Sequence, residues 1–324
     1  MAFETQFRKR KIWFGLTLLV SISAGISIGQ INGPANQNPV PPDEGLVQIA
    51  SEIENRPIEK ASRGYISSDS CRECHAHHYD TWHASHHRTM TQVPTKDSVI
   101  ADFDNKVLVH SGREFRFFHE DDEYFMEVKR ARPSGSDRPP KGKTFKIVLM
   151  TGAHHQQGFW CETGKGRTLG KIPFIWINKE RRWVPYGSIF FLPSSPLSMH
   201  GGIWNSNCIK CHVVGPQPRL DQKSGFDTHV AEFGISCEAC HGPGEAHAAF
   251  QHDLKKADPK QTPMGKQAMI NPAELSHVRS SQTCGQCHSV FDFYDAKAQS
   301  DFMSKDGFQS VSYTHLTLPT TPYV

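Results

Sequence analysis

Hydrophobic and polar residues alternate with a period of two along much of the stretch from residue 106 to about residue 190. The alternation is clear at residues 114–117 and 124–128, and two strongly apolar runs follow at residues 145–150 and 172–177. Turns that contain glycine or proline separate these runs, as they separate strands. The pattern predicts a small antiparallel β insertion over about residues 106–190.

A different pattern opens the chain, where a basic cluster from Arg8 to Lys11 precedes a mainly apolar run from Ile12 to Ile28. This order is typical of an export signal. The 17-residue run lies between a signal-peptide core and a short membrane span in length. Residues 1–30 are therefore predicted to be a signal peptide or a membrane anchor, and either alternative places the remainder outside the cytoplasm. Residues 31–62, rich in Pro, Asn, Gln and Glu, are predicted to be a linker.

Four copies of the pattern Cys-x-x-Cys-His lie on either side of the predicted insertion. This is the attachment motif of c-type haem, because both thiolates add to the porphyrin vinyl groups and the adjacent imidazole ligates the iron. The attachment residues are Cys71, Cys74, Cys208, Cys211, Cys237, Cys240, Cys284 and Cys287. The proximal iron ligands are His75, His212, His241 and His288.

The alternative chemistry for these motifs is a pair of zinc sites with four thiolates each. A zinc ribbon makes no demand on the residue after each cysteine pair, whereas here that residue is histidine all four times. A disulfide framework would not need the histidine either. The sequence therefore favours four haem c groups, each with its iron, as the cofactors.

Composition changes the expected fold. Only 37% of the 324 residues are hydrophobic, while 19 are histidine. Porphyrins are large apolar bodies and would supply much of the core. We therefore expect a mostly α and irregular multihaem cytochrome fold with a haem-packed core over residues 63–310, interrupted by the β insertion. Residues 311–324 match nothing before them and are predicted to be a non-native tail.

Charge excludes one class of partner. The formal net charge of +3 is already present in residues 1–30, where Arg8 to Lys11 outweigh Glu4. The remainder is close to neutral and has no basic stripe with interleaved aromatic residues. No nucleic-acid partner is expected.

The first motif opens a segment, Cys71–Met90, that lacks glycine and proline and is compatible with a helix. Five further histidines follow His75 in it. On such a helix none of them can reach the far face of its own haem, so a ligand among them should serve a neighbouring haem. These histidines are His77, His78, His83, His86 and His87.

Several pieces of the chain resemble the multihaem c-type cytochromes of the cytochrome c-554-like group. They are the first motif with the helix after it, residues 151–157, Trp204-Asn before the second motif, residues 237–247, and the fourth motif. The resemblance implies periplasmic electron transfer through closely stacked haems, most of them with two histidine ligands. Some members are oxidoreductases for small nitrogen or sulfur compounds.

The resemblance also implies distal iron ligands. His87 stands in the Ser-x-His place of the family, with His86 as the runner-up. His155 stands in its His-x-Gln place, with His154 next.

Two further distal candidates follow from their places in the chain. His247 lies six residues beyond His241, past a Gly-Pro-Gly turn that directs the chain away from its own haem. It is therefore expected to serve another haem. His277 lies seven residues before Cys284 and completes the set.

Three functions remain open. Extracytoplasmic electron transfer through mostly bis-histidine haems is favoured, because histidine is abundant enough to close all four irons. One alternative is an oxidoreductase that acts on a small molecule at one five-coordinate haem. The other is a haem-containing sensor or scaffold whose partner-binding region lies beyond residue 310. Expected partners are redox proteins or membrane quinol oxidase or reductase components, with the N-terminus as an anchor.

Overall fold

The computed structural model describes residues 55–130, 141–189, 202–256, 269–289, 293 and 295–304. All of them belong to one compact unit, Asp43–Val324. The predicted signal or anchor 1–30, most of the linker 31–62 and the tail 311–324 lie outside the described residues. Among the helices of the described part, none has the length and apolar character needed to cross a membrane.

The described residues contain about as much strand as helix, 32% against 30%. The expectation of a mostly α and irregular fold is therefore wrong. The β part is also no small insertion, because it forms a large, nearly closed antiparallel sheet. The physical reason is that the strands bury an aromatic core of their own instead of contributing a few segments to a haem-packed core.

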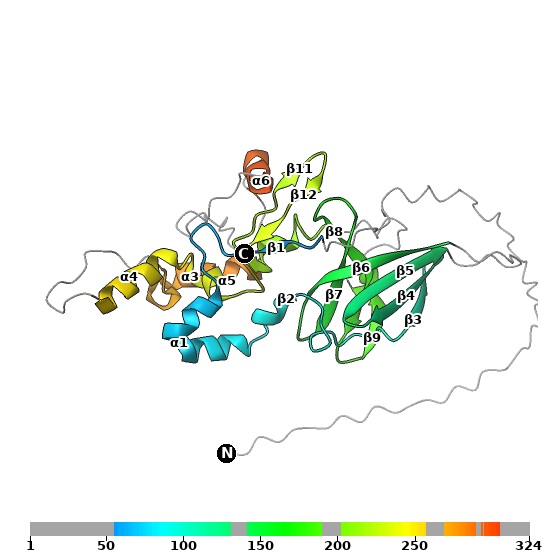
Figure 1. The fold of residues 1–324 in the computed structure, drawn as a ribbon, viewed down its shortest axis with the longest axis horizontal. Coiled ribbons are helices and arrows are strands. Elements are labelled where there is room, and N and C mark those ends of the chain that lie inside the picture. The colour runs from blue at the N-terminus through cyan, green and yellow to red at the C-terminus, as the bar shows by residue number, and fades with distance from the viewer. Residues whose placement is uncertain are drawn as a thin grey trace, which may run out of the picture. The chain divides into compact units, whose positions relative to one another are not determined.

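The sheet has eight strands, seven of which follow one another in the order of the chain, β3-β4-β5-β6-β7-β8-β9. Every neighbouring pair is antiparallel, and β2 pairs with the C-terminal end of β6, beyond the part that pairs with β5, through Thr91 and Thr151. Figure 1 shows the sheet, mainly green, with β2 leading into it from α1. The strands are β2 (Thr91–Gln92), β3 (Lys106–His110), β4 (Arg113–Glu120), β5 (Glu123–Arg130), β6 (Gly142–Thr151), β7 (Gln156–Glu162), β8 (Leu169–Ile177) and β9 (Arg182–Pro185).

One face of the sheet carries the aromatic core. Phe115 and Phe117 of β4 are buried and meet Trp183 of β9, whose ring stacks on Phe117 with centroids 4.5 Å apart. The polar residues between them face outward, as the alternating pattern requires. Burying such aromatic side chains stabilises a fold by about 25 cal/mol per Å² of apolar surface removed from water.

The opposite face of the sheet supports the second attachment motif. A register shift in β6 interrupts the alternation, so Leu149 turns away from the aromatic core, and Trp160 of β7 points to the same side between Phe159 and Cys161, which face the core. They pack in a second buried cluster with Trp204 and Ile209, and Ile209 lies inside the motif itself. The sheet therefore fixes the position of this motif.

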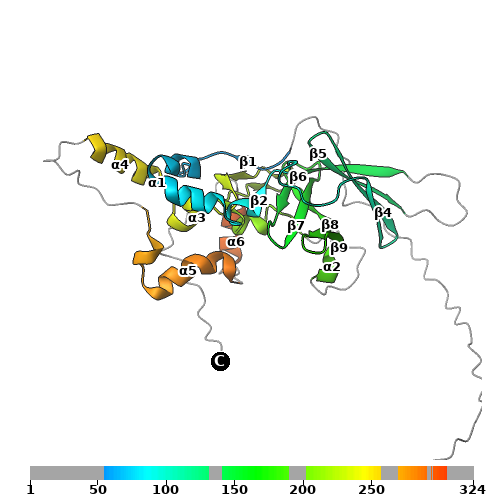
Figure 2. The same cartoon turned by 90° about the horizontal axis from the view of Figure 1, so that it is seen from below.

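The first, third and fourth attachment motifs lie on helices α1, α3 and α5, which gather away from the sheet together with α4 (Figures 1 and 2), whereas the second motif lies on a short turn against the sheet. The helices are α1 (Ser68–His83), α2 (Tyr186–Ile189), α3 (Cys237–His241), α4 (Glu245–Lys256), α5 (His277–His288) and α6 (Ala296–Met303), with the 3₁₀ turns η1 (Arg88–Met90), η3 (Cys208–Lys210) and η4 (Pro272–Glu274). The remaining strands are β1 (Ile58–Glu59), β10 (Val213–Val214), β11 (Leu220–Asp221), β12 (Gly225–Phe226), β13 (His229–Val230) and β14 (Glu232–Phe233).

Helix α1 bears the first motif and is irregular at its iron ligand. His75 has non-helical angles, φ −121° and ψ 40°, inside the helix. Tyr79 anchors the helix from within, because its hydroxyl donates to Asp69 Oδ1 at 2.7 Å. Trp82 ties the last turn to the chain before the third motif, since its indole Nε1 donates to the Ile235 carbonyl oxygen at 2.8 Å.

Candidate haem-binding site

The first and third attachment motifs share one cavity of about 730 Å³. Cavities that hold cofactors and other small ligands measure about 300–1,000 Å³. The wall includes Cys71, Cys74 and His75 from α1, and Cys237 and His241 from α3. A hydrogen bond between the thiols of Cys71 and Cys237 raises the pKa of Cys71 and lowers that of Cys237. Attachment cysteines of two different motifs are therefore in contact.

The second and fourth motifs form a matching pair. The Cys287 thiol donates to the Cys211 carbonyl oxygen at 3.7 Å, and the Cys211 thiol donates to the Gln286 carbonyl oxygen at 3.6 Å. The hydrogen bond between the two side chains is the main reason why the pKa of Cys211 is lowered and that of Cys287 raised. The motifs therefore pair as first with third and second with fourth.

The other attachment cysteines differ in exposure. Cys74 and Cys284 are exposed, whereas Cys240 is partly buried. Burial raises the pKa of the Cys208 thiol to about 11. All nine cysteines are free of disulfides, and Cys161, which belongs to no motif, is buried in β7, as a small apolar residue would be.

Two pairs of histidines that come from different parts of the chain have the spacing that a shared iron requires; His75 also lies 6.4 Å from His78, but both of these rings are on α1. Because a metal–imidazole nitrogen bond is about 2 Å long, two rings on opposite sides of one iron have centroids about 6 Å apart. The rings of His75 and His247 are 6.3 Å apart and nearly parallel, at 26°. The rings of His87 and His288 are 6.2 Å apart, at 69°. In each pair a proximal ligand faces a histidine from a different part of the chain.

The remaining distal candidates are placed differently. His154 and His155 lie between β6 and β7 with ring centroids 4.3 Å apart, and His154 also approaches His86 at 4.5 Å. These separations are too short for an iron between the rings. Among the ring contacts of the described residues, none involves His277, which is exposed at the start of α5.

The two other proximal histidines sit in contrasting surroundings. His241 Nδ1 lies 2.8 Å from the Ile270 carbonyl oxygen, a hydrogen bond that orients the ring and leaves Nε2 available for a metal. Burial lowers the pKa of His212, against a hydrogen bond that its ring donates to the Met90 backbone carbonyl and that raises it. Burial also lowers the pKa of His247, with His75 and His241 contributing in the same direction. A neutral imidazole is the form that ligates a metal.

Sequence reasoning overlooked the variable residues inside the motifs. Glu238 is fully buried, and its carboxylate accepts hydrogen bonds from the backbone N–H groups of Ile66 and Ser67 ahead of the first motif. Gln286 Nε2 donates to the Ala239 carbonyl oxygen in the third motif at 2.9 Å. A fully buried carboxylate needs hydrogen-bond partners, and those of Glu238 lie far away in the chain, so no local sequence signal marks it.

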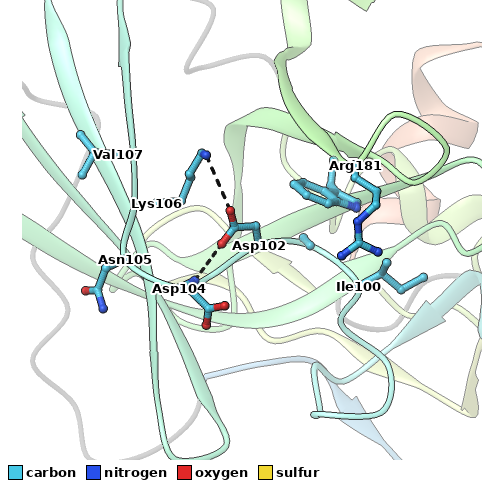
Figure 3. A pocket seen from close by; sticks show the side chains of 9 residues that line it. Ile100, Asp102, Asp104, Asn105, Lys106, Val107 and Arg181 are labelled. Carbon is cyan, nitrogen blue, oxygen red and sulfur yellow. Dashed lines mark hydrogen bonds and ion pairs between the residues drawn. The ribbon is translucent and has the colours of Figure 1, made fainter.

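A second cavity, of about 720 Å³, lies at the edge of the sheet between β3 and the turn from β8 to β9 (Figure 3). Asp102 organises its floor, because one of its oxygens accepts from the Asp104 backbone N–H at 3.0 Å and the other lies 3.7 Å from Lys106 Nζ. Arg181 borders it from the turn (Figure 3). None of the predicted haem-binding residues lines this cavity.

The donor set suits haem iron. Within the described ranges, no group of three or more His, Cys, Asp or Glu side chains is arranged to hold a metal ion. A haem iron takes four ligands from the porphyrin and needs only two from the protein, which is what each histidine pair offers beside a Cys-x-x-Cys-His motif. This is the arrangement expected of a multihaem c-type cytochrome.

Comparison with known proteins points to the same class. The family model described as cytochrome c554 and c-prime matches residues 70–111 and 197–242, which contain the first three attachment motifs. The family resemblance seen in the sequence is thereby confirmed, and it implies covalently bound haem c with iron. The search of curated proteins found no match.

One solved structure, that of the outer cell wall cytochrome OcwA, is similar at 20% sequence identity with a TM-score of 0.45. The similarity covers 75% of this chain and 40% of that one, so the chain spans less than half of its length.

Proposed function

We propose that the chain is an extracytoplasmic electron relay with four covalently attached haem c groups, most of them held by two histidines. The observation that carries the proposal is the pair of histidine couples, His75 with His247 and His87 with His288, at 6.3 and 6.2 Å. A bis-histidine haem has no open position on its iron and supplies one-electron transfer without substrate binding.

The pairing of the motifs supports a relay. Contacts between Cys71 and Cys237, and between Cys211 and Cys287, bring the attachment edges of two haems together in each pair. Gln286 connects the two pairs through its hydrogen bond to Ala239 in the third motif. These contacts support a relay in which the two pairs of haems would lie next to each other.

Redox proteins or membrane quinol-oxidising or quinone-reducing components are the proposed partners, and the N-terminal segment is the proposed export signal or anchor. The basic cluster and apolar run of residues 8–28 support this location.

The test of the relay is a haem count combined with spectroscopy on the exported protein. Pyridine haemochrome and mass spectrometry should give four covalent haems, and electron paramagnetic resonance should show mainly low-spin ferric iron. Zinc without added porphyrin mass would overturn the proposal.

A second candidate function, reduction or oxidation of a small nitrogen or sulfur compound, is favoured by the surroundings of the second motif. Burial lowers the pKa of Lys171 to about 8, while the nearby Cys208 acts in the opposite direction. Its ammonium lies 2.9 Å from the centre of the Tyr186 ring. A group that exchanges protons near neutral pH beside one haem is typical of a catalytic site. Binding of CO or NO to the ferrous protein as isolated would decide for this function.

A further inference from the structure

The carboxylate of Glu238 connects the first and third attachment motifs. Its Oε1 accepts from the backbone N–H of Gly244 at 2.7 Å, and its Oε2 from that of Ser67 at 3.0 Å. The N–H of Ile66 lies 3.1 Å from both oxygens. Ile66 and Ser67 immediately precede α1, and Gly244 follows the third motif. One fully buried side chain therefore joins three segments that surround two attachment sites.

Glu232 completes the connection. Its Oε2 accepts from the backbone N–H and from the hydroxyl of Ser68, at 2.9 and 3.0 Å, and from the hydroxyl of Ser236 at 2.8 Å. The backbone N–H groups of three successive residues, 66–68, thus donate hydrogen bonds to two carboxylates of the segment that contains the third motif. Residues 66 and 67 directly precede α1, and residue 68 is its first residue. The N-terminus of a helix favours negative charge, so the two anions stabilise the start of α1 where it stands.

The surroundings of Glu238 are closely packed. A Cβ atom at Gly244 would lie 3.2 Å from Glu238 Oε1 and 3.2 Å from Ile66 Cδ1, closer than ordinary contacts. Ser67 has φ 71°, a left-handed conformation that costs a non-glycine residue energy and is retained here in the bonded segment.

We propose that Glu238 is a positioning residue that sets the spacing and the electrostatic coupling of the first and third haems by holding the start of α1 against the third attachment motif. The inference rests on the proposed relay, in which these two haems form one pair.

Charge is the second part of the effect. Burial raises the pKa of Glu238, while its hydrogen bonds from Gly244, Ile66 and Ser67 lower it. The three backbone N–H donors favour the ionised form of the carboxylate, against burial and the nearby Glu232, which favour the neutral form. A buried negative charge beside a haem stabilises the ferric over the ferrous state.

The experiment compares Glu238→Ala, Glu238→Gln and wild type as fully loaded holoproteins. Circular dichroism in the Soret region reports how paired haems are oriented, and a redox titration reports their midpoint potentials. Paired haems give a positive and a negative band, the exciton couplet, in this circular dichroism spectrum. In Glu238→Ala we expect part of the couplet to be lost and the midpoint potentials of two haems to shift upward. Glu238→Gln keeps the volume and one acceptor, so it should retain the couplet while its potentials shift upward.

Glu245→Ala is the matched control, because Glu245 is exposed on α4 close to the same turn. It should change neither the couplet nor the potentials. The inference would be overturned if both Glu238 variants kept the exciton couplet and the midpoint potentials of the wild type. If Glu238→Ala fails to load its haems, the potentials of Glu238→Gln decide. The wild-type haem count and spin state test the relay separately, so failure of one proposal is not mistaken for failure of the other.

Discussion

The ring centroids of His87 and His288 lie 6.2 Å apart, although the two residues come from opposite ends of the described chain. His87 lies just after α1, and its carbonyl oxygen accepts from the Ile235 N–H at 3.0 Å. His288 is the last residue of α5 and the proximal ligand of the fourth motif. The fold therefore brings the segment after the first motif beside the fourth motif.

Replacing His87 with glycine should open the iron of the fourth motif. The thioether bonds retain the haem, so the haem count should stay unchanged while a high-spin ferric signal appears and CO binds to the reduced protein. Added imidazole should restore the low-spin spectrum. His119→Gly, in the sheet, is the control and should leave the spectrum as it is; an unchanged spectrum in His87→Gly would refute the assignment.

Replacing His247 with glycine should open a different iron, that of the first motif, because His247 faces His75. The double variant with His87→Gly should show a high-spin signal equal to the sum of the two single variants. If the high-spin signal of the double variant were no larger than that of either single variant, both histidines would act on one iron.

Phe117→Ala should destabilise the sheet strongly. Phe117 is fully buried against Trp183, and truncating a buried phenylalanine costs about 3–5 kcal/mol. The free energy of unfolding, measured in denaturant by tryptophan fluorescence, checks the loss. Val109→Ala, at a position 69% exposed on β3, is the control and should cost about 0.5 kcal/mol or less.

Lys171 should make the free energy of unfolding rise with pH in the alkaline range. Its pKa falls from 10.5 to about 8 in the folded protein, chiefly through burial. Between these values the unfolded chain binds more protons than the folded one, so the free energy of unfolding should rise as pH increases from about 8 to about 10.5. Lys171→Met should remove this rise, whereas Lys179→Met, at an exposed position, should keep it. An identical pH profile in Lys171→Met would contradict the prediction.

The sequence predicts the chemistry better than the architecture. Each Cys-x-x-Cys-His motif specifies attachment and proximal ligation locally, so Cys237 and His241 are identified without any knowledge of the fold. The alternation around Phe115 and Met126 likewise places strands where β4 and β5 lie. It does not reveal that these strands join into one large sheet, because the closing contacts, such as Phe117 with Trp183, are far apart in the chain.

The distal ligands show the same limit. Nothing in the local sequence around His87 names His288 as its partner, since their approach depends on how α1 and α5 pack. Glu238 escaped attention because the motif treats its position as variable. Its role is visible only when Ile66 and Ser67 are seen beside it.

The aromatic core on one face of the sheet has a consequence for how the protein is made. Phe115, Phe117 and Trp183 bury one another without any porphyrin, whereas along α1 the buried side chains are Ser68 and Tyr79. In an exported chain, such a sheet would be able to fold before the cysteines meet haem, and through Ile209 it would hold the second motif in place for attachment.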